Sequence, residues 1–210
     1  MKIFAVSPGC TSILMLAKAL GVELNKKVVN RRLQEHMTPE FLKINPQHSV
    51  PTFVDGKFIL VESRAILTYL VEKHGKDDSL YPKDPQARAY VNQRLYFDMG
   101  TLYQSFADFY YPQLFEKAPA DPAKLKKILD ALEFLDGFLF ASKFVAGDIA
   151  TIADFCTMTS ISAFDTFGYD FSQFKNLTRW YELFKVSLPG SEEIQKMNAE
   201  MKKISEMLKA

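Results

Sequence analysis

The chain has 210 residues, of which 48% are hydrophobic, and its 26 basic and 25 acidic residues leave a net charge of +1. With this balance of charges, the protein has no strong positive electrostatic field that would attract nucleic acid or an anionic membrane, so neither is an expected partner. Two cysteines are too few for a disulfide framework, and no spacing typical of a zinc site is present. No apolar segment suits a signal peptide or a membrane span, and we expect a cytoplasmic protein.

Short strand patterns alternate with helical ones in the first part of the chain. Strands are predicted at 2–6, 27–30, 52–55 and 58–61, and helices at 10–20, after Thr38-Pro39-Glu40, and at 63–74. Gly21 and Gly75 follow helical patterns that they can end, and Gly56-Lys57 predicts a tight turn between the last two strands. This order of elements predicts an α+β domain over residues 1–76.

Strand patterns stop in the second part of the chain. Asp84-Pro85 and Asp121-Pro122 each combine a helix cap with a proline at the first helical position, and each precedes a long helical pattern. Thr151 and Asp154 resemble a capping box, and we expect both to be structural. Further helical patterns occupy 176–186 and 192–208. We therefore predict a linker at 77–84 and an all-helical bundle over residues 85–210.

Four stretches of the first domain contain residues that could bind a small molecule: Ser7-Pro8-Gly9-Cys10, His36, 47–52 and 62–66. Each also has an ordinary structural explanation. Ser7 suits a turn before proline, His48 suits a surface loop, and Glu62-Ser63 suits a helix cap. Only their combination in one domain favours a binding site.

The chemistry of these stretches suits a peptide with a zwitterionic end. A cis Val50-Pro51 bond would offer the backbone of Val50 to an extended peptide. Ser63 at a helix start favours a carboxylate, and Glu62 can accept from an ammonium group. His36 and His48 could then meet a second carboxylate at the other end of the ligand.

Long segments of the chain resemble the cytosolic glutathione transferases and are most similar to the insect delta class. The resemblance is found at 16–27 (LAKALGVELNKK), 39–52 (PEFLKINPQHSVPT), 62–66 (ESRAI), 69–82 (YLVEKHGKDDSLYP) and 92–113 (NQRLYFDMGTLYQSFADFYYPQ). It implies a thioredoxin-like N-terminal domain, an all-helical C-terminal domain and a homodimer. The implied activity is the conjugation of glutathione, as co-substrate, to hydrophobic electrophiles in detoxification, with no metal or other cofactor.

The resemblance also implies site residues. Ser7 would be catalytic, and the glutathione site would consist of His36, His48, Val50, Pro51, Glu62, Ser63 and Arg64. The hydrophobic substrate pocket would be formed by Tyr103, Phe106, Tyr110, Tyr111, Leu114 and Phe115. Ordinary core packing is the alternative for each of these aromatic residues, but three tyrosine hydroxyls in one group favour a pocket.

A serine at position 7 favours conjugation over redox exchange. Lowering a thiol pKa by two units requires about 2.7 kcal/mol of selective stabilisation of the thiolate. A hydroxyl donor and the start of the helix near Cys10 could supply an amount of that order. A cysteine at position 7 would instead form a mixed disulfide with glutathione.

The sequence departs from the delta-class pattern in a shorter loop before Cys10. Alignment from the following helix places Ser7 on the catalytic serine, whereas alignment from the preceding strand deletes that serine. Two alternatives follow: a non-catalytic protein that binds glutathione or hydrophobic molecules, and a glutaredoxin-like reductase that uses Cys10. The absence of a Cys-x-x-Cys motif makes the reductase the weaker of the two.

Overall fold

A computed structural model describes residues 1–5, 10–31, 33–187 and 189–206. Its first half contains a mixed sheet with strand order β2-β1-β3-β4, in which only the β1–β2 pair is parallel. The elements in chain order are β1 (Lys2–Ala5), α1 (Thr11–Ala19), β2 (Asn25–Val28), the short 3-10 helix η1 (Glu35–Met37), α2 (Pro39–Ile44), β3 (Thr52–Asp55), β4 (Phe58–Val61) and α3 (Ser63–His74). The predicted α+β class is therefore confirmed.

The second strand begins earlier than its sequence pattern predicted. The prediction placed it at 27–30, because Val28 and Val29 form a β-branched pair. In the structure β2 pairs with β1 from Lys2 opposite Asn25 to Ala5 opposite Val28. Val29 is buried just beyond the strand, and its N–H donates to the carbonyl of Ala5 at 3.0 Å. Pairing with the neighbouring strand, rather than local propensity, sets the bounds.

The second half of the chain is helical. Its elements are α4 (Pro85–Phe97), the π-helical segment η2 (Asp98–Leu102), α5 (Tyr103–Glu116), α6 (Pro122–Phe140), α7 (Ile152–Thr166), α8 (Lys175–Ser187) and α9 (Ser191–Glu206). Both predicted Asp-Pro caps are present: Asp84 accepts from the Ala87 N–H at 2.9 Å, and Asp121 accepts from the Ala123 N–H at 2.8 Å. These bonds satisfy N–H groups that have no partner within the first helical turn.

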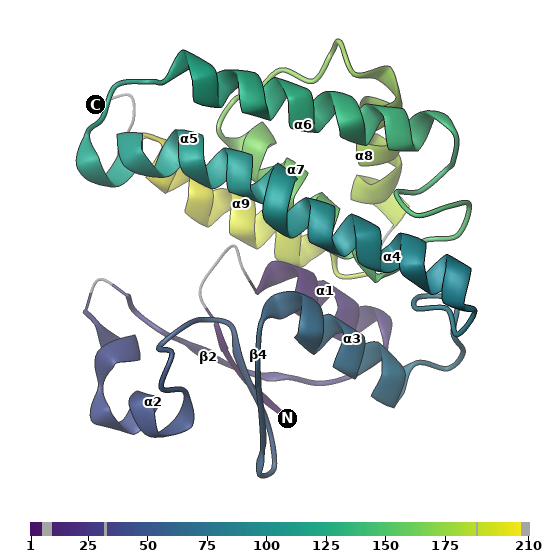
Figure 1. Ribbon diagram of the computed structural model, residues 1–210. Coiled ribbons are helices and arrows are strands. Elements are labelled where there is room, and N and C mark those ends of the chain that lie inside the picture. Colours follow the sequence, from purple (N-terminus) through teal and green to yellow (C-terminus); the bar gives the residue numbers. More distant parts are fainter. Residues whose placement is uncertain (6–9, 32, 188, 207–210) are drawn as a thin grey trace.

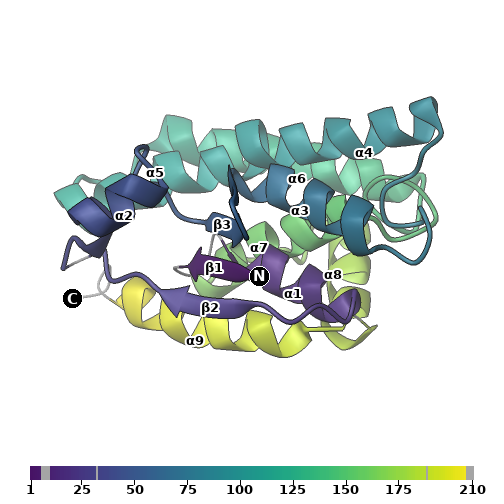
Figure 2. The same cartoon turned by 90° about the horizontal axis from the view of Figure 1, so that it is seen from below.

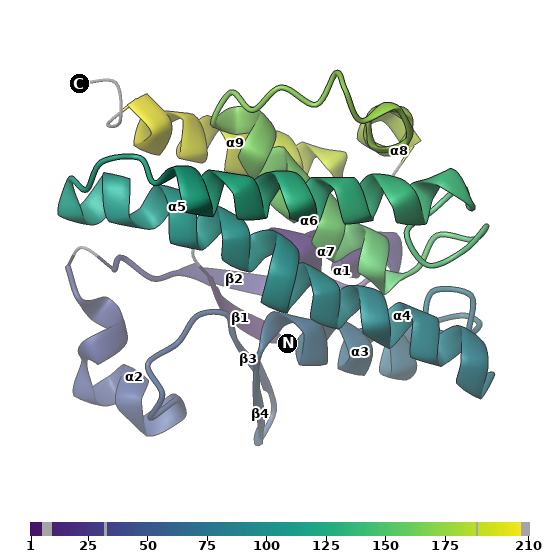
Figure 3. The same cartoon turned by 45° about the horizontal axis from the view of Figure 1, so that its top comes forward.

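The two halves pack through helices. Figures 1 and 3 show α1 and α3 between the sheet and the helices of the second half, and Figure 2 shows α9 beside α1. The residues of α7 from Ile152 to Phe164 are all buried, so this helix lies at the centre of the molecule. Leu67, Leu70 and Val71 of α3 are buried as their spacing predicted. Among the described residues, no helix is long and apolar enough to cross a bilayer.

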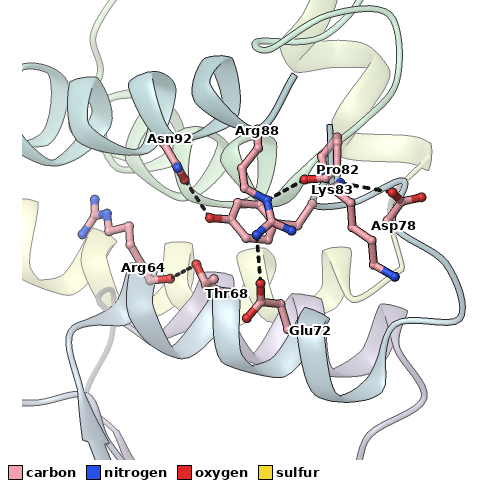
Figure 4. A network of polar contacts seen from close by, with 9 residues as sticks. Arg64, Thr68, Glu72, Asp78, Pro82, Lys83, Arg88 and Asn92 are labelled. Atoms are coloured by element: carbon pink, nitrogen blue, oxygen red, sulfur yellow. Dashed lines mark hydrogen bonds and ion pairs between the residues drawn. The ribbon is translucent and has the colours of Figure 1, made fainter. Parts of the chain in front are cut away.

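Arg88 connects α4 to the end of α3 and to the segment between them (Figure 4). Its Nε donates to the carbonyl of Pro82 at 2.6 Å, and its Nη1 contacts Glu72 of α3 at 3.2 Å. The guanidinium also lies 4.3 Å from the centre of the Tyr81 ring, whose hydroxyl donates to Asn92 at 3.0 Å. These contacts hold α4 beside α3. The domain boundaries at 76 and 85 remain a prediction.

Candidate functional site

A cavity of about 210 Å³ lies where the two halves meet. The loop before β3 and the start of α3 contribute one part of its wall, and α1, α5 and α7 contribute the rest. The lining residues are Ser12, Ser49, Val50, Pro51, Glu62, Ser63, Arg64, Tyr103, Cys156, Thr159 and Ser160. The structure therefore brings together six residues that the sequence singled out: Val50, Pro51, Glu62, Ser63, Arg64 and Tyr103.

The loop before β3 is fixed by a buried asparagine. The Val50–Pro51 peptide bond is cis, as expected. The Nδ2 of Asn45 donates to the carbonyl of Ser49 at 3.0 Å and to the hydroxyl of Thr52 at 2.9 Å. The Thr52 hydroxyl donates in turn to the Ser49 carbonyl at 2.7 Å. This positioning role of Asn45 was not predicted from the sequence, although its place before Pro46 could have suggested it.

The start of α3 presents a carboxylate and a hydroxyl to the cavity. Glu62 is exposed and has a φ of 69°, a left-handed conformation that is uncommon for residues other than glycine. Ser63 is buried directly after it, at the first helical position. Because the first N–H groups of a helix lack partners within it, this end of α3 suits an anion, while Glu62 suits a cation. Together they suit the zwitterionic end of an amino acid.

Arg64 connects the cavity to the helical half through a buried aspartate. Its guanidinium forms an ion pair with Asp98 of η2, which has no exposed surface, and donates to the Ser63 hydroxyl at 3.1 Å. The Ser160 hydroxyl of α7 donates to Asp98 at 2.6 Å. Burial is the largest single influence and opposes the charged form of Arg64, but the attraction and hydrogen bond of Asp98, together with neighbouring groups, outweigh it, so the pKa of Arg64 is raised. Asp98 was not predicted as a site residue, because nothing in the local sequence pattern shows that η2 is π-helical.

His36 and His48 lie close to each other, but neither lines this cavity. The rings of His36 and His48 have centres 6.2 Å apart. The Nδ1 of His36 is buried and has no hydrogen-bond partner among the described residues. His48 is exposed and has a φ of 44°. Their role in binding remains a prediction.

The predicted hydrophobic pocket is only partly supported by the packing of α5. Tyr103 is the member of the predicted group that lines the cavity. Phe106 has no exposed surface, and its ring centre lies 5.0 Å from that of Phe164 in α7; Tyr110 is also buried. These two side chains belong to the core in this structure, because the helix face that carries them turns toward α7. Tyr111 and Leu114 are half-buried, and Phe115 is exposed.

The predicted catalytic residue, Ser7, lies outside the described residues. Cys156 is buried in α7 at the cavity wall, and burial raises the pKa of its thiol to about 12, so it stays protonated near neutral pH. Within the described parts of the chain, no group of three or more acidic, histidine or cysteine side chains could hold a metal ion.

Comparisons with known proteins agree with this architecture. Residues 3–72 match the family model "Glutathione S-transferase, N-terminal domain", and residues 89–185 match "Glutathione S-transferase, C-terminal domain". A delta-class glutathione transferase of Nilaparvata lugens is 51% identical, with 99% of each chain covered and a TM-score of 0.96. A Bombyx mori glutathione transferase is 44% identical, with 98% of this chain and 96% of that chain covered and a TM-score of 0.93.

A more distant structure was solved with a ligand. It is a glutathione transferase homolog from Drosophila mojavensis with bound glutathione. It is 32% identical, covers 98% of this chain and 95% of its own, and has a TM-score of 0.90.

Proposed function

Since the chain belongs to the glutathione transferase family and is similar to insect delta-class enzymes, we propose that it conjugates glutathione to hydrophobic electrophiles in detoxification. One observation carries the proposal. The cavity is lined by Val50, Pro51, Glu62 and Ser63, whose chemistry suits a peptide with a zwitterionic end, and by the aromatic side chain of Tyr103. A thiol held by the first group of residues would face an electrophile held against Tyr103.

In the proposed complex, the backbone of Val50 binds glutathione as an added strand. Glu62 accepts from its α-ammonium group, and Ser63 with the free N–H groups of α3 binds the adjacent carboxylate. Arg64, held by Asp98, donates to the Ser63 hydroxyl and so fixes the side chain that binds this carboxylate. His36 and His48 bind the carboxylate at the far end of the tripeptide.

Ser7 is proposed to donate a hydrogen bond to the glutathione thiolate. Stabilising the thiolate by about 2.7 kcal/mol would lower the thiol pKa by about two units and leave most of it ionised at neutral pH. The hydroxyl cannot form a disulfide with glutathione, which favours attack on a second substrate.

The test compares wild type with Ser7→Ala in conjugation of 1-chloro-2,4-dinitrobenzene, while ultraviolet absorbance titrates the bound thiol. We expect a large rate loss and a raised thiol pKa, with glutathione affinity little changed. Ser172→Ala, which removes a hydroxyl from an exposed turn, is the matched control. An unchanged rate in Ser7→Ala would remove Ser7 from the mechanism. A wild type that binds glutathione but conjugates no electrophile would instead be the non-catalytic binding protein.

We also propose a cytoplasmic homodimer. Exposed apolar side chains support the dimer: Phe58 and Ile59 of β4 are 46% and 42% exposed, and Tyr90 and Tyr96 of α4 are 58% and 67% exposed. Apolar surface of this kind favours association with a second copy. Light scattering at micromolar concentration should give twice the mass of one chain, and a monomeric mass would contradict the proposal.

A further inference from the structure

The outer edge of the sheet, at β2, carries an excess of positive charge. β2 is the first strand in the order β2-β1-β3-β4, and all four of its residues are exposed (Figure 2). Lys26 and Lys27 belong to this strand, and the exposed Arg31 follows it. Between Glu23 and Glu35 the sequence contains four basic residues and no acidic residue. This edge is therefore more positive than the net charge of the chain suggests.

The neighbouring strand β1 adds another cation to this edge. The register pairs Phe4 of β1 with Lys27 of β2, so these two side chains lie on the same face of the sheet. The ammonium group of Lys2 lies 5.8 Å from the centre of the Phe4 ring, which places it on that face as well. None of the ion pairs among the described residues involves Lys2, Lys26, Lys27 or Arg31. These positive charges are therefore available to an anionic partner.

Large apolar residues are exposed beside these cations. Val28 is the last residue of β2 and Leu33 lies in the segment that follows, and both are 71% exposed. Met37, in η1, is 43% exposed. A single exposed apolar residue is ordinary, but three within ten positions, interleaved with cations, are typical of a surface that binds the interface of a membrane.

Two other occupants suit this edge less well. A strand from a second copy could pair with β2, but the lysines of both copies would then meet, and lysine on an edge strand opposes such pairing. The proposed dimer uses β4, at the opposite edge of the sheet, and so leaves β2 exposed. An acidic protein would satisfy the cations, but it would give no role to the exposed Val28 and Leu33.

We propose that this edge is a docking surface for membranes that contain anionic phospholipids. The docking surface consists of Lys2, Lys26, Lys27, Val28, Arg31 and Leu33. Its cations bind the anionic headgroups, while its two apolar side chains enter the boundary between headgroups and acyl chains. The net charge of +1 suggested no such partner, but it is a sum over the whole chain and does not describe how charge is distributed.

Docking would place the predicted glutathione site close to the membrane. His36 follows Leu33 by three positions, so one end of that site borders the docking surface. Hydrophobic electrophiles dissolve in bilayers, and a docked protein would meet them there at raised concentration. This consequence rests on the proposed function, whereas the docking itself does not.

The experiment measures how much of the full-length protein sediments with sucrose-loaded vesicles. Vesicles of phosphatidylcholine with about 30 mol% phosphatidylserine are compared with vesicles of pure phosphatidylcholine. We expect the partition coefficient to be about tenfold higher, or more, with the anionic vesicles. It should fall as NaCl rises from about 50 mM to about 150 mM, because salt screens the attraction between the cations and the headgroups.

Variants of the docking surface separate the two contributions. Lys26→Glu together with Lys27→Glu should lower partitioning into the anionic vesicles about tenfold or more, because it reverses two charges at the membrane surface. Leu33→Ser should lower it about threefold, because it removes an apolar side chain that enters the lipid.

The matched controls lie on α6, on the opposite side of the molecule from β2 (Figure 1). Lys126→Glu together with Lys127→Glu makes the same change in charge at another pair of adjacent exposed lysines. Phe140→Ser removes an apolar side chain from a residue that is 81% exposed. Both controls should partition within about twofold of wild type, because charge far from the bound surface is screened.

Three results would overturn the docking surface: equal sedimentation with both kinds of vesicle, no sedimentation with the anionic vesicles at low salt, or equal losses in the β2 and α6 double variants. A wild type that binds poly-L-glutamate but not vesicles would replace the lipid with an acidic protein partner. If the double lysine variant of β2 does not fold, Leu33→Ser applies the same test. Sedimentation is measured without substrate, so a wild type that docks but conjugates no electrophile would confirm this inference and contradict the proposed function.

Discussion

Two buried aspartates in the helical half have contrasting environments. Asp98 in η2 and Asp154 in α7 both have no exposed surface. The partners of Asp98 are the Arg64 guanidinium and the Ser160 hydroxyl, and both of these residues line the cavity. Asp154 accepts from the backbone N–H groups of Thr151 at 2.8 Å and Val145 at 3.0 Å, and from Trp180 Nε1 at 3.0 Å.

A buried carboxylate can therefore stabilise the fold or position the residues of a site, depending on the charge of its partners. Asp154 has only neutral donors, so burial raises its pKa to about 6 although the hydrogen bonds act in the opposite direction. It caps the start of α7, as its capping pattern predicted, and it also binds the preceding loop at Val145 and the side chain of Trp180. Asp98 has a cationic partner from the other half of the chain, and it thereby positions a wall of the cavity.

The largest effect is expected from Asp154→Ala. The substitution would leave three buried N–H groups without an acceptor, and we expect the free energy of unfolding to fall by about 3–4 kcal/mol. Urea unfolding followed by circular dichroism measures this loss. The KM for glutathione should change less than twofold in the folded fraction, and a large change in KM would contradict the purely structural role.

Asp98→Ala should reduce both stability and substrate binding. It leaves the largely buried Arg64 cation without its partner, which costs about 3 kcal/mol of unfolding free energy. Because Arg64 lines the cavity, the KM for glutathione should rise about tenfold. Asp130→Ala, which breaks an exposed ion pair with Lys126, is the control and should cost less than about 0.5 kcal/mol. A loss of stability without a change in the KM for glutathione would show that Asp98 does not affect glutathione binding.

The raised pKa of Asp154 predicts a pH dependence of stability. The pKa of Asp154 in the folded state, about 6, lies above the ordinary aspartate pKa of 3.8, so between these pH values the folded state binds more protons than the unfolded state. The contribution of Asp154 to the free energy of unfolding should therefore fall by on the order of 2–3 kcal/mol between pH 4 and pH 7. Asp154→Asn should lack this decline, and parallel pH profiles of the two proteins would contradict the assignment.

The smallest effects come from single hydroxyl contacts to the two aspartates. Ser160→Ala removes the 2.6 Å bond to Asp98 and should cost about 1 kcal/mol, whereas Thr151→Ala removes a 3.3 Å contact to Asp154 and should cost about 0.5 kcal/mol. Only Ser160→Ala should raise the KM for glutathione, by about threefold. Equal effects of both variants on KM would remove the functional contrast between the aspartates.

Interactions between near neighbours made much of the fold predictable. The caps at Asp84 and Asp121 bind N–H groups two residues away, and Asp84 also binds the next one, so a short window of sequence contains both partners. The helical face of α3 and the hairpin turn at Gly56-Lys57 depend on equally short spacings. The start of β2 was less predictable, because its partner Lys2 lies in another strand.

The residues of the candidate site also differ in how far they could be predicted from near neighbours in the sequence. Val50, Pro51, Glu62 and Ser63 belong to short motifs whose backbone chemistry can be recognised in the sequence, and the cavity contains all of them. Tyr103 and Phe106 are three residues apart on one helix, yet one lines the cavity and the other is fully buried. Their difference arises from the packing of α5 against α7, which residue spacing along one helix does not contain.

The amino-acid sequence was sufficient to indicate the order of elements, the helix caps and the family, because those signals come from residues close together in the chain or from long matching segments. Three contacts could be seen only in the folded chain. They are the ion pair of Arg64 with Asp98, the hydrogen bond from Ser160 to the same carboxylate, and the contact between the Tyr103 and Tyr111 hydroxyls. The first two contacts join different helices and involve Asp98 of η2, and the third joins side chains eight positions apart on α5. Packing energies are summed over many contacts rather than contained in any short motif.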